Sequence, residues 1–495
     1  MKSPIPHMIQ YLPLERRPAT FSAAGEIDQE AFLAALWSRK SVSTPQGLRE
    51  MTSLRLFLKA MSGFIWSRCL LACLILPVTS RRLDPDGPSN RPYFTNVWLA
   101  ADMNNDSFDD LVIGGPRWEN GSFVDVGVPL QVLLTDGNGF FKEDAALVFG
   151  SENAIPRPVH AREGVTADFN RDGFPDIAIA SHGADFLDES GRFPMERNFL
   201  ILSQPNGKYT EVGKGNPAFD YLGFTHSLAV GDIDSDGDVD IVFNDLFVQD
   251  EEFCMNLRIL VNDGSGNFTH RIETLPDAVY ADQFCPSWLS TSLVDMNGDT
   301  HLDLVLGGGR TGDKSVILFN DGAGVFNSPD GVHELPSNRR YVLVPDVLAH
   351  DVNMDGRMDL ILSTTREEPF YEGRYLRVLI QNTDGDYIDE TSRYMPQQLW
   401  ALPWVVELRL VDLNNDDLED LLLLFEYSEV SSRFAYLRAA DGSFKLPAAG
   451  AMGAGNGTAV NIDVDGDQDT DLVFVRGLFA EPEVYLLGAL KRNDG

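Results

Sequence analysis

The chain has 495 residues, 43% of them hydrophobic, and its 75 acidic side chains against 39 basic ones give a formal net charge of −36. This apolar content is too high for a disordered acidic chain, so the charge belongs to a protein that folds. Such a charge repels a phosphate backbone, which excludes nucleic acid as a partner. The length requires several domains or one large repeat architecture.

The first eighty residues predict targeting. Basic residues precede an apolar run over residues 69–78, and the small residues Thr79 and Ser80 follow it. This order is typical of a secretory signal peptide, which we assign to residues 51–80. An uncleaved membrane anchor is the alternative, although about ten apolar residues are too few to span a bilayer. We interpret residues 1–50 as a non-structured or mis-assigned extension, with translation starting at Met51 or Met61.

Cysteine is scarce, and none of the four cysteines forms a CxxC pair, so a zinc ribbon or a thioredoxin-like redox centre is excluded. Only Cys254 and Cys285 lie in the body of the chain. They are either two unpaired core residues or, in an exported protein, a disulfide. The sequence leaves both alternatives open.

Seven segments share the pattern Asp-x-(Asn/Asp)-x-Asp-x-x-x-Asp, numbered here as loop positions 1 to 9, at intervals of about 60 residues. A period of that length is typical of propellers and arrays. We predict that positions 1, 3, 5 and 9 are metal ligands. They are Asp102, Asn104, Asp106 and Asp110; Asp168, Asn170, Asp172 and Asp176; Asp232, Asp234, Asp236 and Asp240; Asp295, Asn297, Asp299 and Asp303; Asp351, Asn353, Asp355 and Asp359; Asp412, Asn414, Asp416 and Asp420; and Asp463, Asp465, Asp467 and Asp471.

The ligand chemistry points to calcium. Ca²⁺ takes about six to eight oxygen ligands, and side chains at positions 1, 3 and 5 of a tight loop converge on one point. Zinc would need His or Cys, and magnesium would keep more water. An acidic turn without metal is the alternative for one loop, but seven identical spacings favour up to seven Ca²⁺ ions. An EF-hand is rejected because position 12 is apolar in every copy.

Position 6 of such a loop favours glycine because the backbone takes a positive φ there. Only Gly173, Gly237 and Gly356 supply it, so we expect those three loops to be the safest sites. The other four loops are expected to be weaker or differently turned.

A second repeated element is an Asn-Gly or Asp-Gly hairpin, found at residues 135–140, 206–209, 262–268, 320–326, 384–387 and 441–444. Such dipeptides between strand-like flanks predict tight β-hairpins. Each unit then reads strand, calcium loop, strand, variable loop, strand, hairpin, strand. We therefore predict an all-β fold over residues 90–495, a seven-bladed β-propeller of four-stranded antiparallel blades with calcium-binding hairpin loops. A strand from just before Asp102 is expected to complete the last blade.

The calcium loops and the Asp-Gly-x-Gly-x-Phe hairpins resemble FG-GAP/VCBS repeats, the units of the integrin α-subunit propeller and of many bacterial surface proteins. The Phe-Gly and Gly-Ala-Pro signatures are poorly kept, with Phe149-Gly150 and Gly114-Gly115-Pro116 as the nearest matches, which favours the VCBS branch. The resemblance implies calcium that stiffens the blades, an extracellular setting and a role in adhesion or ligand binding.

Strand parity places the calcium loops and the hairpins on one face of the propeller. The second-to-third strand loops and the inter-blade connections share the other face, where aromatic and arginine side chains are candidate anchors for a ligand. The predicted ligand-binding residues are Trp118, Arg192, Trp288, Arg310, Arg366, Tyr371 and Trp400.

We therefore predict a secreted, periplasmic or cell-surface binding or adhesion module with structural calcium. Its expected partner is an extracellular protein or a glycan, with membrane contact only through an uncleaved anchor. No GxSxG, HExxH or phosphate-binding loop occurs. A catalytic role is the less favoured alternative, as a polysaccharide lyase or hydrolase with its site on the loop face.

Overall fold

The computed structural model describes residues 95–485, except for 120–121, 124, 138–139, 185, 189–191, 249–256, 272–275, 277–286, 310–313, 327–331, 338–341, 370, 399–403, 415, 426–433, 448–457, 465, 467–469 and 476–482. The predicted signal segment and the Cys254 and Cys285 positions lie outside the described residues, so those expectations stay predictions. Across the part of the chain that is described, no helix is long and apolar enough to cross a membrane.

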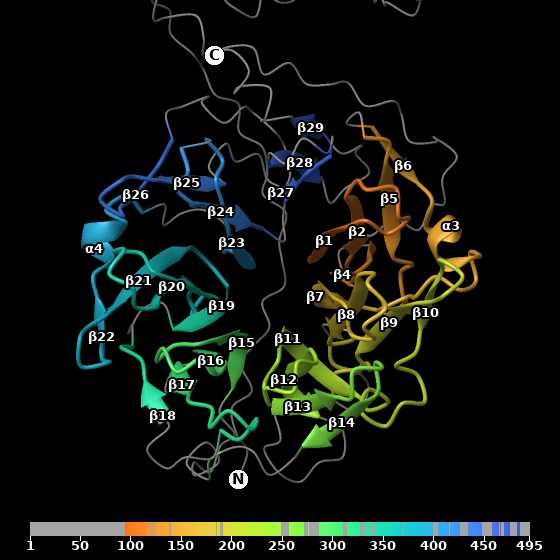
Figure 1. Ribbon diagram of the computed structural model, residues 1–495, viewed down its shortest axis with the longest axis horizontal. Helices are drawn as coiled ribbons and strands as arrows, with labels where there is room; N and C mark the ends of the chain where they lie inside the picture. Colours follow the sequence, from red (N-terminus) through yellow and green to blue (C-terminus); the bar gives the residue numbers. More distant parts are fainter. Residues whose placement is uncertain are drawn as a thin grey trace, which may run out of the picture. The chain divides into compact units, whose positions relative to one another are not determined.

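Six antiparallel sheets of four strands, here called blades 1 to 6, follow one another in chain order (Figure 1). Blades 1 to 3 contain β1 (Val97–Ala101), β2 (Asp110–Gly114), β5 (Gln131–Thr135) and β6 (Phe141–Glu143); β7 (Ala161–Ala167), β8 (Asp176–Ser181), β9 (Phe199–Ser203) and β10 (Tyr209–Glu211); and β11 (Gly223–Gly231), β12 (Asp240–Val248), β13 (Leu257–Asn262) and β14 (Phe268–Arg271). Blades 4 to 6 contain β15 (Trp288–Val294), β16 (Asp303–Gly308), β17 (Val316–Leu318) and β18 (Val332–Glu334); β19 (Leu343–His350), β20 (Asp359–Thr365), β21 (Tyr375–Gln381) and β22 (Tyr387–Asp389); and β23 (Glu407–Val411), β24 (Asp420–Leu424), β25 (Ala435–Arg438) and β26 (Phe444–Lys445).

Smaller elements complete the described fold. A seventh sheet has three strands, β27 (Thr458–Ile462), β28 (Asp471–Val475) and β29 (Glu483–Tyr485). The ribbon of β3 (Trp118–Glu119) and β4 (Ser122–Phe123) lies within blade 1, between β2 and β5 in the chain. Two short helices, α3 (Ala145–Phe149) and α4 (Thr391–Tyr394), follow β6 and β22, and the Asp144 side chain caps α3 by accepting from the Leu147 N–H at 3.1 Å.

The expected count of seven four-stranded blades is wrong for the described residues, which form six. Among the described residues the seventh sheet has three strands, and the Asp494-Gly495 pair lies outside them. The strand just before Asp102 does not complete that sheet. It is β1, and it pairs with β2 of its own blade, with Ala101 opposite Asp110.

The repeated loops join the strands as the sequence predicts. In each blade the nine-residue loop connects the first and second strands, and position 9 is the first residue of the second strand. The Asn-Gly and Asp-Gly hairpins connect the third and fourth strands. Both connections therefore lie at the same end of the blade.

Direct contact between loop and hairpin confirms this shared face. In blades 1, 3 and 4 the side chain at position 7 covers a hairpin glycine of its own blade, as Phe108 does over Gly137 and His301 over Gly322. A Cβ added to Gly137 would lie 2.4 Å from the Phe108 ring, and its φ of +69° also favours glycine. Gly137 is thus required by both turn geometry and packing.

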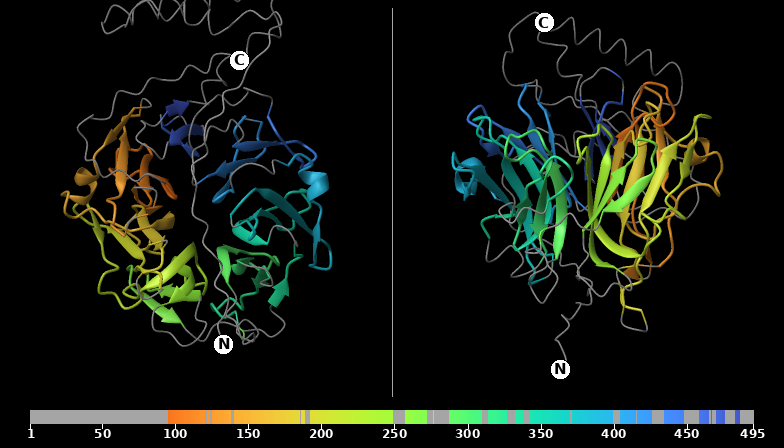
Figure 2. Two further views of the ribbon diagram at one scale, coloured as in Figure 1. Left: turned by 180° about the vertical axis from the view of Figure 1, so that it is seen from behind. Right: turned by 60° about the horizontal axis from the view of Figure 1, so that its bottom comes forward.

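The sheets pack face to face around a common centre, with the first strand of each innermost (Figure 1), and the same succession is visible from behind in Figure 2. Buried apolar clusters join neighbouring sheets, and one of them holds Trp98 and Leu111 of blade 1 together with Phe474 of the seventh sheet. The Thr135 hydroxyl also donates to the Val464 carbonyl at 3.3 Å. The last sheet therefore packs on the first, which closes the ring.

Candidate functional site

The backbone of the repeated loops turns through two left-handed residues. Positive φ occurs at position 4, for example +61° at Met354, and again at position 6. At position 6 the non-glycine residues Ser107, Thr300 and Asp417 take φ of +74°, +76° and +64°, close to the +85° of Gly356. The expectation that loops without this glycine turn differently is therefore wrong for these three. They keep the turn at the cost of backbone strain.

Two carboxylates hold each loop together. In the blade 2 loop, Asp168 at position 1 accepts the N–H groups of Asp172 and Gly173 at 3.1 and 2.9 Å. Asp172 at position 5 accepts the Phe174 N–H at 3.0 Å. The loops from Asp102, Asp232, Asp295, Asp351 and Asp412 repeat the position-1 bonds. The sequence pattern therefore also fixes the loop conformation through internal hydrogen bonds.

The position-3 oxygens distinguish the loops. The side-chain oxygens Asn104 Oδ1, Asp234 Oδ1 and Asn353 Oδ1 are buried without a hydrogen-bond donor among the described residues. Asn170 and Asn297 instead accept the N–H of their own position-5 residue at 2.9 and 2.8 Å. A buried oxygen without a donor is costly unless a cation or water meets it.

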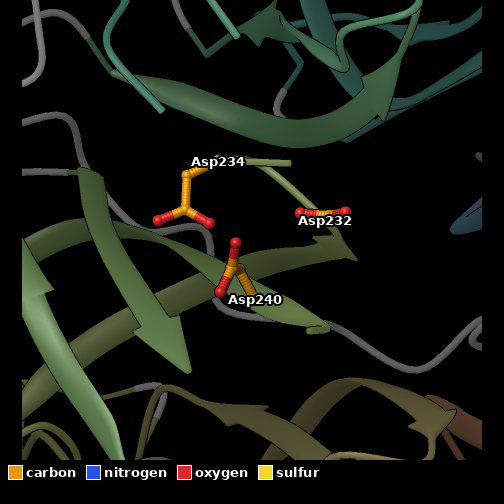
Figure 3. Close-up of side chains that lie close together, drawn as sticks. All are labelled: Asp232, Asp234 and Asp240. Atoms are coloured by element: carbon orange, nitrogen blue, oxygen red, sulfur yellow. The ribbon is translucent and has the colours of Figure 1, made fainter. Parts of the chain in front are cut away.

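The loop of blade 3 offers the densest set of acidic oxygens. Asp232, Asp234 and Asp240 each place a carboxylate oxygen within 4.8 Å of the others. Figure 3 shows the Asp234 and Asp240 carboxylates turned toward one another, with Asp232 beside them. Oxygen ligands alone, carried by carboxylates, suit a hard cation such as Ca²⁺. The residues present therefore fit the predicted metal in this loop, and in the loops of Asn104 and Asn353.

Position 9 has a second role that the ligand pattern did not reveal. Each of these aspartates is buried, and its two oxygens accept the N–H of position 2 and the N–H of a residue at the end of the third strand, here called the bracket residue. The aspartates with their position-2 and bracket partners are Asp110 with Met103 and Thr135, Asp176 with Phe169 and Ser203, Asp240 with Ile233 and Asn262, Asp303 with Met296 and Asn320, Asp359 with Val352 and Gln381, and Asp420 with Leu413 and Arg438, all at 2.7–3.0 Å.

Burial opposes the charge on these aspartates. It raises the pKa of Asp110 to about 7 and that of Asp303 to about 6, while the backbone donors act in the opposite direction. Position 9 therefore ties the repeated loop to the third strand, in addition to its predicted role as a metal ligand. Of the predicted metal ligands, Asp465 and Asp467 lie outside the described residues.

The residues predicted to bind a ligand on the opposite face lie in different environments. Trp288 lies in the core, 4% exposed, and its Nε1 donates to the Lys314 carbonyl at 3.2 Å, so its ring is not open to a ligand. Arg192 is exposed in a turn closed by the Asp188 N–H, which donates to the Arg192 carbonyl at 2.8 Å. Trp118 belongs to the β3–β4 ribbon. Arg310 and Trp400 lie outside the described residues.

Tyr371 and Arg366 belong to the β20–β21 loop of blade 5. Tyr371 has a φ of +54°, an uncommon conformation for an aromatic residue, and its N–H donates to the Arg366 carbonyl at 2.9 Å. Its ring meets the Trp404 ring edge-on at 4.6 Å between centroids, and its hydroxyl lies 3.4 Å from Nε2 of His226 in blade 3. This loop thus reaches from blade 5 to blade 3.

Three buried histidines lie beside this contact, and together with Tyr371, Trp404 and Arg162 we call them the axial cluster. They are His160, His182 and His226, which are 2%, 3% and 8% exposed. His160 and His182 have ring centroids 3.9 Å apart, and His182 stacks at 6.4 Å from His226. These residues stand where first strands begin or second strands end, opposite the calcium loops.

The hydrogen bonds of the axial cluster favour neutral imidazoles. His226 Nδ1 lies 2.7 Å from the Leu289 carbonyl, so it carries the proton, and Nε2 is left to accept from Tyr371. Burial, the neighbouring histidines and the Arg162 guanidinium hold the pKa of His160 and His226 well below the ordinary value. Arg162 itself lies 5.1 Å from the centre of the Trp404 ring.

Carboxylates from three blades approach one another next to this cluster. Burial, Asp346 of blade 5 and Glu407 of blade 6 raise the pKa of Glu163 in blade 2 well above its ordinary value. Burial also raises the pKa of Asp346 to about 7. Arg409 lies 2.5 Å from Glu407 and compensates part of this charge. Acidic side chains from blades 2, 5 and 6 thus lie near one another.

Comparison with known proteins agrees with the repeat pattern. A model of the FG-GAP-like repeat matches residues 168–243, which run from the nine-residue loop of blade 2 into the second strand of blade 3. The other blades repeat the same loop and strand order. The chain is a β-propeller that contains an FG-GAP-like repeat.

The solved structures that match this chain are only distantly similar to it. An Agrocybe aegerita lectin described for its recognition of non-reducing terminal N-acetylglucosamine is 16% identical, with 73% of this chain and 84% of that chain covered and a TM-score of 0.44. BBS1N in complex with ARL6DN is 10% identical, with 80% and 94% covered and a TM-score of 0.41. A GH43_1 enzyme from Xanthomonas citri is 13% identical, with 60% and 92% covered and a TM-score of 0.34. Identities and TM-scores this low support no inference about the ligand or activity of this chain.

Two features of this FG-GAP propeller escaped the sequence analysis. Position 2 of every loop is apolar, and its side chain is at most 3% exposed, which anchors the loop in the core. That regularity was visible in the sequence as Met103, Phe169, Ile233, Met296, Val352, Leu413 and Val464. The axial cluster left no such signal, because its histidines are far apart in the sequence and follow no shared spacing.

Proposed function

We propose that this propeller is an exported, calcium-binding module whose calcium ions are structural and whose ligand contacts the face opposite the calcium loops. The calcium part rests on the buried position-3 oxygens of Asn104, Asp234 and Asn353, which have no donor among the described residues. Each belongs to a loop whose position-1 carboxylate already orders the turn. A bound cation would supply the missing partner.

Calcium binding is tested by thermal unfolding with and without a chelator. At a calcium concentration about twenty times the dissociation constant, each site adds ~1.8 kcal/mol to the free energy of unfolding. EDTA should therefore lower the melting temperature, and re-added Ca²⁺ should restore it while Mg²⁺ should not. The double variant Asp232→Asn with Asp236→Asn should lose part of this response. A melting temperature that does not change when EDTA is added would refute calcium binding.

The ligand part rests on the axial cluster. Variable loops on a rigid scaffold carry binding residues more often than the scaffold does, and aromatic and arginine side chains are the usual anchors. Here a half-buried tyrosine in a strained conformation stands at the centre of the face, beside Trp404 and Arg162. We expect an extracellular protein or a glycan to bind there, and the predicted signal segment places the protein outside the cytoplasm.

An array of glycans and extracellular-matrix proteins tests this part. Binding should require Tyr371 and should be lost in Tyr371→Ala. It should persist in Ile388→Ala, which changes a side chain 50% exposed on the outer strand β22 of the same blade. Equal binding by both variants would place the ligand elsewhere.

A second candidate function is a polysaccharide lyase or hydrolase at the same face. The observation in its favour is the raised pKa of Glu163 and Asp346, since a carboxyl group that stays protonated near neutral pH can act as a general acid. Release of reducing ends or unsaturated sugars by the wild type, lost in Asp346→Asn, would support catalysis. Binding without product formation would support the binding module.

A further inference from the structure

The bracket residues make a second set of contacts, from one blade to the previous one. Besides giving its N–H to its own position-9 aspartate, the bracket residue donates through its side chain to the carbonyl of position 2 in the preceding calcium loop. The bonds are Asn262 to Phe169 (2.8 Å), Asn320 to Ile233 (2.8 Å), Gln381 to Met296 (2.9 Å), Arg438 to Val352 (3.0 Å) and Thr135 to Val464 (3.3 Å).

From blade 6 to blade 2 these bonds join into one buried chain, and the Thr135 bond links blade 1 to the seventh sheet separately. From blade 3 to blade 2 it runs from Asp240 to the N–H of Asn262, through the Asn262 amide to the Phe169 carbonyl, and from the Phe169 N–H to Asp176. Asp176, Asp240 and Phe169 are 0% exposed and Asn262 is 3% exposed. Hydrogen bonds in such surroundings are costly to break and transmit displacement to their neighbours.

The chain passes directly through the predicted metal loops. Position 2 stands between ligand positions 1 and 3, so the placement of its backbone sets the placement of both ligands. Its carbonyl is held by the next blade and its N–H by its own position-9 aspartate. A cation that orders positions 1 and 3 therefore also orders the bracket residue of the next blade, and with it the next position-9 carboxylate.

Blade 2 interrupts the series. Its bracket residue is Ser203, whose hydroxyl donates to Asp172 Oδ2 in its own loop at 2.6 Å. The short side chain is thus used within blade 2, where the other bracket residues reach the preceding blade. Blade 2 is therefore linked to blade 3 by Asn262, whereas its own bracket residue makes no such bond toward blade 1 in the described structure.

We infer that calcium binding is coupled between neighbouring blades through this chain of hydrogen bonds, with a break between blades 1 and 2. This inference rests on the proposed calcium function and adds how its sites are regulated. Coupling is reciprocal by thermodynamic linkage. Occupancy of the blade 3 loop therefore raises the cation affinity of the blade 2 loop, and occupancy of the blade 2 loop raises that of the blade 3 loop. Calcium then binds to linked groups of blades together, and the blades of a group become rigid together.

A site-resolved reporter on blade 2 tests the coupling. Phe174, at position 7 of that loop and 40% exposed, is changed to tryptophan to sensitise the luminescence of Tb³⁺, a hard cation used in place of Ca²⁺. The neighbouring loops are then weakened one at a time at the exposed position-5 aspartates, by Asp236→Asn in blade 3 or Asp106→Asn in blade 1. Asp106→Asn in blade 1 is the matched control.

Asp236→Asn should weaken Tb³⁺ binding at the blade 2 reporter by at least about fivefold, whereas Asp106→Asn should change it by less than about twofold. In an Asn262→Leu background the effect of Asp236→Asn should disappear. Asn262→Ser, which copies the residue that blade 2 carries at the same place, gives the same test if the leucine variant fails to fold.

Equal effects of Asp236→Asn and Asp106→Asn would overturn the coupling, and so would an effect of Asp236→Asn that survives the loss of the Asn262 amide. In both cases Tb³⁺ and Ca²⁺ still bind, and the proposed calcium function stands. A reporter that shows no Tb³⁺ luminescence, together with a melting temperature indifferent to Ca²⁺, would overturn the proposed function and the coupling with it.

Discussion

Arg409 is the side chain on which closure of the ring most directly depends. It lies on β23, the first strand of blade 6, and its guanidinium donates to the Trp98 carbonyl of β1 at 2.8 Å and to Asn461 Oδ1 of β27 at 3.2 Å. It also pairs with Glu407 on its own strand. One residue thus connects blade 6, the seventh sheet and blade 1, and we predict that Arg409→Met destabilises the whole propeller.

The expected loss can be worked out from these contacts. Hydrogen bonds from a charged group contribute about 1.5–3 kcal/mol each, and two of them are lost. Loss of the partly exposed ion pair with Glu407 raises this cost by up to about 1 kcal/mol, and packing of the new methionine side chain lowers it by about as much. The net cost is ~3–6 kcal/mol, a large part of the ~5–15 kcal/mol that stabilises a typical domain.

Thermal unfolding in EDTA, where calcium does not contribute, is the assay. An unfolding entropy of about 2.1 cal/mol/K per residue over roughly 400 residues means that ~4 kcal/mol lowers the melting temperature by about 5 °C. Arg409→Lys should fall in between, because an ammonium group cannot reproduce the fork of donors. The control Arg393→Met changes an exposed arginine on α4 that pairs with its neighbour Glu390 and lies over the Tyr394 ring. A melting temperature of Arg409→Met within 1 °C of the control (about 1 kcal/mol) would refute the reasoning.

Three further predictions concern backbone strain, hairpin packing and pH. Thr300→Gly should stabilise the apo protein by up to about 1 kcal/mol by relieving a β-branched residue at φ +76°, and the reciprocal Gly356→Thr should destabilise it, as urea unfolding will show. Gly442→Ala should cost at least about 1 kcal/mol more than Gly385→Ala, because its Cβ would lie 2.3 Å from the Val352 carbonyl while that of Gly385 meets nothing within 4 Å; equal costs would contradict the packing. His226 has a lowered pKa in the fold, so the unfolded chain takes up its proton first and wild-type stability falls as the pH drops below about 6.5. The destabilisation caused by His226→Gln should therefore shrink by up to about 1.4 kcal/mol per pH unit below 6.5 in urea titrations, and a difference independent of pH would contradict it.

Much of the blade architecture could be predicted from local sequence because it is set by local physics. An Asp-Gly pair between apolar runs favours a tight hairpin, and carboxylates at positions 1 and 5 close their loop with N–H groups a few residues away. Repetition of these signals then predicts repeated antiparallel sheets. The expectation that a strand just before Asp102 completes the last sheet is wrong, because that strand is β1 and pairs with β2 of its own blade.

The loop chemistry was only partly predictable. The spacing of the aspartates indicates which side chains converge, but it does not show that position 9 is also the acceptor for the third strand. That role depends on pairing between residues such as Asp303 and Asn320, which are separated by the whole second strand and its following loop. The expected importance of glycine at position 6 was also overstated, since the loop bonds hold Thr300 at a positive φ.

The sequence by itself determined the repeated unit, its strand order and the residues predicted to face a cation, because each of these follows from contacts within about ten residues of the chain. Only the tertiary structure decided what meets at the centre and between the blades. His226 and Tyr371 touch across the ring, and Asn262 reaches the carbonyl of Phe169 in the preceding blade. Such contacts depend on how the sheets close upon one another, and ring closure is a property of the whole chain that no local pattern carries.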